Sequence, residues 1–119
     1  MLIILGIEGV SALPIQISTC TTISAPGEYV LIANITNSNA TNCIQITSSN
    51  VTFHGAGYTI DGIDGPITYG VYVYKPSTLN NVTIKNLEVS DWYFGMWYEN
   101  AQNGSIVNNI VSLNTHTGI

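Results

Sequence analysis

Three aspartates, Asp61, Asp64 and Asp91, are the residues of this chain best suited to chemistry. Asp61 and Asp64 stand three residues apart in a glycine-rich segment, and carboxylate oxygens on a flexible loop suit Ca²⁺. Two carboxylates supply too few of the about six to eight oxygen ligands of calcium, and Asp-Gly is also a frequent turn dipeptide. We therefore treat Asp61 and Asp64 as candidate calcium ligands and all three aspartates as candidate catalytic residues, with a simple turn as the favoured alternative.

The two histidines, His54 and His116, are candidate ligands for copper, which binds imidazole and sulfur donors. They and Met96 are spread over separate segments, so turn or core positions explain them as well. Inverting glycoside hydrolysis would need two carboxyl groups about 6.5–9.5 Å apart, and the sequence does not place the aspartates on one face. Enzyme activity stays open, and the residues favour a non-catalytic role.

Aromatic residues are densest between Asp91 and Tyr98, and Tyr69, Tyr72 and Tyr74 precede them. If alternate strand residues point outward, Tyr72 and Trp97 become neighbours on an outer face, where sugar rings can stack on them. Tyr72 and Trp97 are therefore the candidate carbohydrate-binding residues. The alternative is that Trp92 and Phe94 fill the interior and the other rings shield a corner.

An imperfect repeat must position these residues. Cys43-Ile44-Gln45-Ile46, Gly70-Val71-Tyr72-Val73 and Gly95-Met96-Trp97-Tyr98 align with one another, and from Ile44 the steps to Val71, Met96 and Ile119 are 27, 25 and 23 residues. This is the length of one coil of a β-solenoid and is too short for most helical repeats. The sequence predicts a solenoid of short strands separated by Asn, Gly or Ser turns.

Two interior columns of apolar residues follow from this alignment. The first contains Ile44 and Ile46, Val71 and Val73, and Met96 and Tyr98; the second contains Val51 and Phe53, Val82 and Ile84, and Ile106. Just after the second column the alignment predicts corner residues, which tolerate a left-handed backbone, at Gly55, Asn86 and Asn109.

The chain divides into three segments. Residues 1–12 are apolar and end in a small-residue pattern similar to a signal-peptidase site, so we interpret them as a truncated signal peptide or an apolar cap strand. Residues 13–42 form an N-terminal cap segment, with either a hairpin or a first incomplete coil, and residues 43–119 form the coils. Because the chain stops as another coil begins, we expect a fragment of a longer solenoid, with further coils or a partner at its open C-terminal end.

Charge excludes nucleic acid as a partner. The chain has two lysines, no arginine and a formal net charge of −5, whereas phosphate binding depends on clustered Lys and Arg. The apolar N-terminal run is too short to cross a bilayer as a helix, so no membrane span is expected in the mature chain.

Export would place Cys20 and Cys43, the only cysteines, where they can form a disulfide; two buried thiols are the alternative in a reducing compartment. Five Asn-x-Ser/Thr triplets would then be potential glycosylation sites, although a chain rich in Asn and Thr contains such triplets by composition alone. They begin at Asn34, Asn39, Asn50, Asn81 and Asn103.

Several of these motifs resemble the opening of right-handed parallel β-helix proteins of the NosD-like, pectate-lyase-like kind. They are Cys20 followed by Pro26-Gly27-Glu28-Tyr29, Cys43-Ile44-Gln45-Ile46, Asn50-Val51-Thr52-Phe53 and Gly57-Tyr58-Thr59-Ile60-Asp61-Gly62. The resemblance covers residues 18–119 and implies an all-β fold, a single-stranded right-handed parallel β-helix of about three to four coils. Such proteins are common on microbial, notably archaeal, cell surfaces.

The resemblance implies a secreted, periplasmic or cell-surface module with a structural or carbohydrate-interacting role and a polysaccharide or cell-envelope glycan as partner. The alternatives are the N-terminal part of a polysaccharide lyase or glycoside hydrolase, and a NosD-type periplasmic copper-binding accessory protein. Lyases of this kind use calcium and an Arg or Lys base, which here would have to be Lys75 or Lys85. Apart from calcium, no cofactor is expected.

Overall fold

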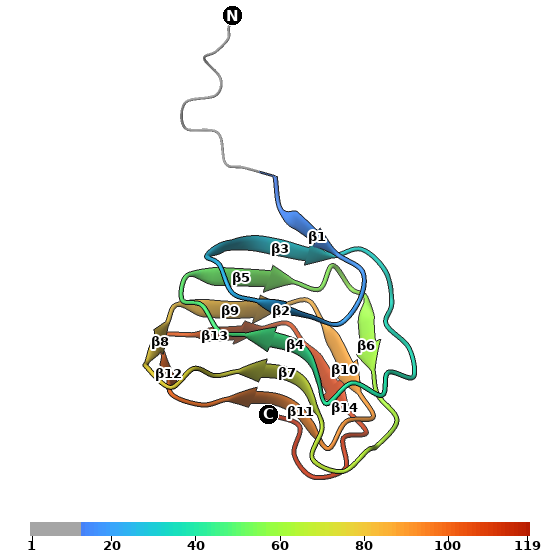
Figure 1. The fold of residues 1–119 in the computed structure, drawn as a ribbon. Helices are drawn as coiled ribbons and strands as arrows, with labels where there is room; N and C mark the ends of the chain where they lie inside the picture. The colour runs from blue at the N-terminus through green and yellow to red at the C-terminus, as the bar shows by residue number, and fades with distance from the viewer. Residues whose placement is uncertain (1–12) are drawn as a thin grey trace, which may run out of the picture.

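A computed structural model describes residues 13–119, and the N-terminal segment expected to be a signal peptide or cap, residues 1–12, lies outside this range. The described residues form strands joined by short turns (Figure 1). The strands are β1 (Ile15–Ile17), β2 (Thr21–Ile23), β3 (Gly27–Leu31), β4 (Asn42–Ile46), β5 (Val51–His54), β6 (Thr59–Asp61), β7 (Tyr69–Val73), β8 (Leu79–Asn80), β9 (Val82–Lys85), β10 (Glu88–Ser90), β11 (Phe94–Tyr98), β12 (Ala101–Gln102), β13 (Ser105–Val107) and β14 (Ile110–Ser112).

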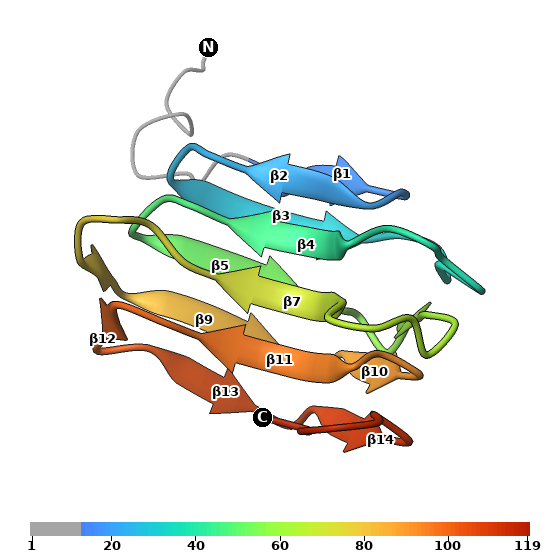
Figure 2. The same ribbon diagram turned by 60° about the horizontal axis from the view of Figure 1, so that its bottom comes forward.

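Successive strands go to different sheets, and the chain then returns to the first. One sheet has the order β1-β3-β5-β9-β13, a second β11-β7-β4-β2 and a third β14-β10-β6, while β8 and β12 form a small pair. Each strand pairing within residues 13–119 is parallel. We call each return to the same sheet a circuit; Figure 2 shows the circuits lying one below another. The fold is therefore all-β.

The register predicted from the repeat is confirmed by the strand pairing. In the first column Ile44 pairs with Val71 and Val71 with Met96. In the second, Phe53 pairs with Ile84 and Ile84 with Ile106. The interior position predicted for Ile106 is wrong, because it lies on the edge strand β13 and is 36% exposed. The segment before residue 42 joins the same sheets, since β2 pairs with β4 and β3 pairs with β1 and β5. This parallel pairing fits an incomplete first circuit and not a hairpin.

Apolar side chains from the inner faces of the three main sheets form one core. It contains Ile44, Val71 and Met96 from one sheet, Phe53 and Ile84 from another, and Ile60 and Val89 from the third. Trp92 is its largest buried side chain, at 1% exposed, and the indole Nε1 donates a 3.3 Å hydrogen bond to the Ile60 carbonyl. One interpretation of the sequence placed both Trp92 and Phe94 in the interior. Trp92 is internal, whereas Phe94 is half-buried on the outer side of β11.

The predicted corner residues need correction at two positions. Asn86 has the expected left-handed backbone, with φ 55°, but its equivalent in the next circuit is Asn108, also at φ 55°, and not Asn109. Asn109 instead binds the preceding circuit: its Oδ1 accepts from the Leu87 N–H and its Nδ2 donates to the Ile84 carbonyl. Gly55 lies in the equivalent position but has no left-handed φ.

Close approach of the backbone, rather than a left-handed φ, explains several glycines. A Cβ on Gly55 would lie 2.5 Å from the Asn86 carbonyl oxygen, and one on Gly70 would lie 2.6 Å from the Gly95 carbonyl oxygen. Gly95 meets Gly118 in the same way. These glycines allow circuits to stack at sheet spacing where the chain turns inward.

The predicted disulfide between Cys20 and Cys43 is present and joins the first two circuits. It links neighbouring strand ends, with the Cα atoms 4.4 Å apart, since Thr21 pairs with Ile44 in the next register position. Cys43 is fully buried beside Ile44, in the column position that Gly70 and Gly95 occupy in later circuits. The crosslink therefore fits the existing register.

We predict that the disulfide contributes about 3 kcal/mol to the free energy of unfolding, because it restricts the unfolded chain over a loop of this length. Urea unfolding of the oxidised protein, with and without reductant, measures this difference. A Cys20→Ala/Cys43→Ala variant should behave like the reduced protein and be insensitive to reductant. Equal midpoints for oxidised and reduced protein would contradict the prediction.

Gly70→Ala should lower the free energy of unfolding by roughly 1–3 kcal/mol, because the added methyl group collides with the backbone of the next circuit. Gly65→Ala is the matched control, since its Cβ would meet only the Thr68 methyl at 3.3 Å. Thermal unfolding followed by circular dichroism measures both variants. The explanation fails if the two substitutions have the same effect.

Candidate functional site

Aromatic side chains occupy the outer positions of two neighbouring strands. In β7 these are Tyr69 and Tyr72, and in β11 they are Phe94 and Trp97, with Tyr69 paired to Phe94 and Tyr72 to Trp97. The equivalent outer positions of β4 are the polar residues Asn42 and Gln45. We call Tyr69, Tyr72, Tyr74, Phe94 and Trp97 the aromatic face; all five are half-buried.

The pattern of burial along β7 explains why the outer residues are three apart. Gly70 and Val71 are both buried, so Tyr69 and Tyr72 both lie on the outer side, and β11 repeats this with Phe94, Gly95, Met96 and Trp97. The predicted pairing of Tyr72 with Trp97 on the outer face is thus confirmed. Strict alternation could not have predicted that Tyr69 and Phe94 join them.

The tyrosines of the aromatic face stack on one another. The Tyr69 ring stacks on Tyr72 at a centroid distance of 4.4 Å and on Phe94 at 4.9 Å. Tyr72 also stacks on Tyr74 at 5.6 Å. Two neighbouring rings therefore already engage the π-system of Tyr72, which leaves its edge and hydroxyl for any ligand.

Trp97 is arranged differently from the tyrosines. Its ring is tilted by 59° to Phe94 and by 73° to Tyr69, with centroid distances of 4.6 and 6.3 Å. The first contact is tilted and the second is an edge contact, so neither is a parallel stack. Trp97 is thus the ring of the aromatic face that takes part in no parallel stack.

One acidic residue lies at the edge of the aromatic face. The Tyr72 hydroxyl donates a 3.0 Å hydrogen bond to Glu99 Oε1. Burial, followed by this hydrogen bond and the charge of Glu99, raises the pKa of Tyr72 to about 12. Tyr72 is therefore a neutral hydrogen-bond donor at physiological pH, and Glu99 brings a negative charge to this surface.

The three candidate aspartates come together where β6 and β10 end. Asp61 accepts hydrogen bonds from the Asn37 N–H at 2.9 Å and the Ser90 hydroxyl at 3.2 Å, and Asp64 accepts one from the Thr115 hydroxyl at 2.9 Å. The chain's own groups thus use several of the carboxylate oxygens. Sequence alone placed Asp61 and Asp64 together; Asp91 joins them because Val89 pairs with Ile60 in the neighbouring circuit.

Asp61 and Asp91 interact as a pair with opposite changes in pKa. The pKa of Asp91 is raised, first by a hydrogen bond to Asp61, then by burial and the negative charges of Asp61 and Asp64. The pKa of Asp61 is lowered: burial raises it, but hydrogen bonds from Asn37, Asp91 and Ser90 outweigh burial. The pair therefore holds a proton on Asp91 more readily than on Asp61.

Neither a metal centre nor a catalytic basic residue is assembled at these carboxylates. Within residues 13–119, no group of three or more His, Cys, Asp or Glu side chains could hold a metal ion. The lysines lie elsewhere: Lys85 ends β9 and Lys75 follows β7. Asp61 and Asp91 can share a proton, and the hydrogen bonds of Asp61 and Asp64 hold the turns that follow β6 and β10.

The two histidines do not meet. His54, at the end of β5, accepts a 2.8 Å hydrogen bond from the Ala56 N–H at Nδ1, and its Nε2 lies 3.4 Å from Asn86 Nδ2. His116 follows β14 and stacks on Tyr93 at 5.0 Å. His116 therefore extends the ring system beyond Phe94, while His54 belongs to a corner of another sheet.

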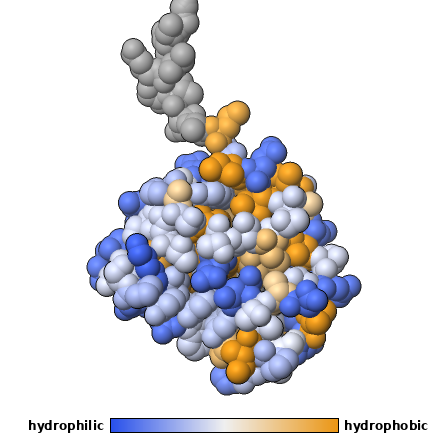
Figure 3. Space-filling model, viewed as in Figure 1, coloured by the Kyte–Doolittle hydropathy of each residue, from blue (hydrophilic) through white to orange (hydrophobic). Residues whose placement is uncertain are grey.

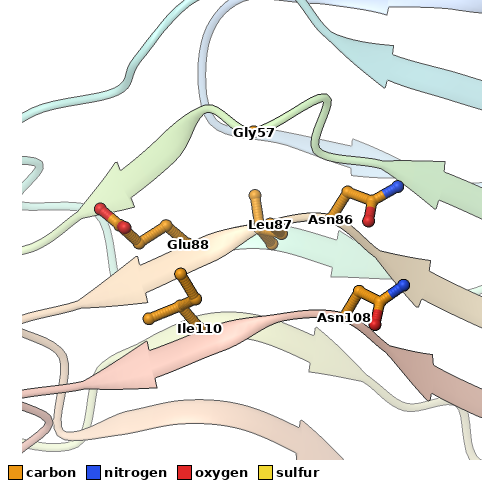
Figure 4. A pocket seen from close by; sticks show the side chains of 6 residues that line it. All are labelled: Gly57, Asn86, Leu87, Glu88, Asn108 and Ile110. Carbon is orange, nitrogen blue, oxygen red and sulfur yellow. The ribbon is translucent and has the colours of Figure 1, made fainter.

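A hollow lies where the sheet containing β9 meets the sheet containing β10. Figure 4 shows the Asn86 and Asn108 amides side by side at one end of it and Glu88 and Ile110 at the other. Its volume is about 180 Å³, below the ~300 Å³ at which ligand pockets usually begin. Glu88 Oε1 also accepts a 2.7 Å hydrogen bond from the Thr59 hydroxyl, so its carboxylate is already engaged within the chain.

Comparisons with family models, with curated proteins and with known structures found no match to this chain. Among residues 13–119, no helix is long and apolar enough to cross a membrane.

Sequence reasoning missed Glu99, because its partner Tyr72 lies 27 residues away and only the stacking of circuits brings them together. Phe94 and Tyr69 were visible in the aromatic run but not assigned to the outer face. The signal that could have found them is the small residue after each, Gly70 and Gly95, which places two consecutive residues inside.

Asp91→Asn should make the protein more stable than wild type at pH 7, with the difference shrinking toward pH 4. A raised folded-state pKa means that wild type loses stability as pH rises from the ordinary aspartate pKa through the folded pKa of Asp91. The lowered pKa of Asp61 has its effect at lower pH, below the ordinary aspartate pKa. There the protein loses stability as the pH falls and Asp61 becomes protonated. Urea midpoints of both proteins between pH 3.5 and about 7.5 test this; a pH-independent difference would contradict it.

Proposed function

We propose that this chain is an exported right-handed parallel β-helix module that binds a polysaccharide through its aromatic face. The observation that carries the proposal is the pair of aromatic residues on each of two in-register strands, which exposes several rings together on one surface. Surfaces of this kind suit sugar rings, because apolar sugar faces pack on aromatic rings and hydroxyls bind polar groups at the edge.

The β-helix assignment is supported by the parallel register. Equivalent residues return to the same sheet after one circuit, and inner positions are apolar in each of three sheets. We infer the right-handed winding from the resemblance of the sequence to NosD-like and pectate-lyase-like proteins. This fold places outer side chains of successive coils in rows, which is how it would build an extended binding surface.

Export is supported by the disulfide. Disulfides persist in oxidising compartments, and Cys20 and Cys43 are joined in a geometry that fits the register without displacement of the strands. The disulfide therefore supports a secreted, periplasmic or cell-surface location. The small number of charged residues and the many Asn and Thr side chains suit a surface that contacts glycans through neutral hydrogen bonds.

The charge at the aromatic face favours a neutral glycan over an acidic one. Glu99 is held there by Tyr72, so a uronate carboxylate placed beside it would meet a like charge. Trp97 supplies the stacking ring, and the Tyr72 hydroxyl and Glu99 carboxylate supply hydrogen-bonding groups. A chain of neutral hexoses is the class of ligand that these groups fit.

Apolar side chains at both ends of the stack suggest that further structure covers them. Figure 3 shows orange surface at the top and bottom of the view, and the exposed residues include Leu13 and Ile15 on the first circuit. On the last circuit Ile110, Leu113 and Ile119 are each more than half exposed. We propose that further coils of the same protein or a partner chain pack on the last circuit.

Trp97→Ala should weaken binding to a neutral polysaccharide by about tenfold, or ~1.4 kcal/mol, because it removes the unstacked ring of the aromatic face. Affinity electrophoresis or retention on immobilised neutral glucans, mannans and galactans measures the change. Tyr58→Ala is the matched control, because Tyr58 is an exposed aromatic residue outside the aromatic face.

Equal retention of wild type and Trp97→Ala across these glycans would overturn the binding proposal and leave the aromatic face a purely structural ladder. Polygalacturonate is the acidic comparison. Tighter binding to it than to neutral glycans would contradict the ligand class assigned from Glu99.

A further inference from the structure

Three of the five Asn-x-Ser/Thr triplets lie at one corner of the stack. Asn50, Asn81 and Asn103 each come just before a strand of the same sheet, β5, β9 or β13, and they are in register because Val51 pairs with Val82 and Thr83 with Ser105. All three have a left-handed backbone, with φ 60°, 63° and 56°. They form a column of asparagines spaced as strands are, about 4.8 Å apart.

Hydrogen bonds between circuits engage this asparagine column. Asn81 Nδ2 donates to Asn50 Oδ1 at 3.1 Å, and Asn103 Nδ2 donates to Asn80 Oδ1 at 3.3 Å. The backbone is paired too, since the Asn50 N–H donates to the Asn80 carbonyl and the Asn81 N–H to the Gln102 carbonyl. The residues after each asparagine continue into the strand, so these triplets are held in the sheet.

The triplet that begins at Asn34 is also held. Asn34 Oδ1 accepts a 2.9 Å hydrogen bond from the Thr59 N–H. The next residue, Ile35, forms a parallel bridge with Ile60: its N–H donates to the Thr59 carbonyl, and its carbonyl accepts from the Asp61 N–H. This triplet is therefore paired with the neighbouring circuit through both its side chain and its backbone.

The triplet Asn39-Ala40-Thr41 differs from the other four. It lies in the loop between β3 and β4, which projects from the stack in Figure 2. All five acceptor asparagines are exposed, but within residues 13–119 only Asn39 has no side-chain hydrogen bond to another circuit. The Ala40 N–H bonds within the loop, to the Ser38 hydroxyl at 3.2 Å. The loop is anchored on both sides, by Ser38 to the Asp61 carbonyl and by the Thr41 carbonyl to the Tyr69 N–H. Asn39 is thus presented on a fixed loop outside the sheets.

We propose that Asn39 is the single N-glycosylation site of the folded chain. In the reaction Asn39 Nδ2 attacks the anomeric carbon of a lipid-linked oligosaccharide. The new N–C bond replaces the C–O bond to the lipid diphosphate, which leaves, and the amide loses one proton to the transferase. The acceptor needs an accessible amide on a surface loop, and Asn39 meets this condition because its exposed side chain makes no hydrogen bond within residues 13–119.

Glycans on the asparagine column would be incompatible with the stack. A sugar on Asn81 Nδ2 would occupy the space of the Asn50 side chain to which it donates, and a strand spacing leaves no room for glycans on neighbouring circuits. In the cell the inference rests on the export proposed above, because the chain must reach a glycosylating compartment. The test in vitro does not depend on export or on polysaccharide binding.

The experiment incubates the folded, oxidised full chain with a purified single-subunit oligosaccharyltransferase and a lipid-linked oligosaccharide. Intact mass then counts the glycans, and peptide mapping locates them. Five synthetic peptides, one for each triplet, serve as unfolded acceptors and should all be modified. The folded chain should gain one glycan, at Asn39.

Asn39→Gln should reduce addition to the folded chain to none, and Thr41→Ala should do the same while Thr41→Ser restores it. Asn34→Gln and Asn50→Gln are the matched controls and should leave one glycan in place. Circular dichroism confirms that each variant is folded. Modification of any other triplet in the folded chain to the extent of Asn39, or an unmodified Asn39 whose peptide is accepted, would overturn the proposal.

Discussion

Parallel, in-register pairing between successive circuits is the constraint on which this structure depends. Each strand borders the strand one circuit earlier, so its backbone hydrogen bonds fix which residues lie above one another. A shift of one residue would turn the apolar side chains of that strand outward. The core, the close glycine contacts and the disulfide all require the same register, and each of them also opposes a shift.

Because of the same constraint, a residue type that recurs at equivalent positions of successive circuits forms a row on the surface. At the outer positions of β7 and β11 the row is aromatic, and at the corner before β5, β9 and β13 it consists of asparagines. In the aromatic row, rings stack on neighbouring rings, and in the asparagine row, side-chain amides hydrogen-bond to one another. In the aromatic row, Trp97 is the ring that takes part in no parallel stack.

Much of the strand register could be predicted from the sequence, because residues at equivalent positions of the repeat pair with one another. The alignment of Ile44, Val71 and Met96 required only their spacing and apolar character. What it could not supply were local departures from the repeat. Asn108 and not Asn109 has the left-handed backbone because the last circuit is shorter, and spacing alone does not show where a residue is lost.

The candidate site was predictable only where its members lie within one repeat or at equivalent positions. Tyr72 and Trp97 were found because they are equivalent. Glu99 and Asp91 depend on side chains that reach across circuits, and no sequence spacing encodes such contacts. Tyr69 was missed because Gly70 allows two consecutive residues to face inward, which breaks the alternation expected of a strand.

The position of the disulfide also has a mechanical consequence. The first and last described strands, β1 and β14, lie at opposite ends of the stack, so a force applied to the two ends of the chain pulls circuits apart along the direction of their hydrogen bonds (Figure 1). The Cys20–Cys43 disulfide links the first two circuits covalently, whereas the later described circuits are held to one another by hydrogen bonds and side-chain packing. Under load, circuits beyond Cys43 can separate one at a time, whereas Cys20 and Cys43 keep β2 and β4 together.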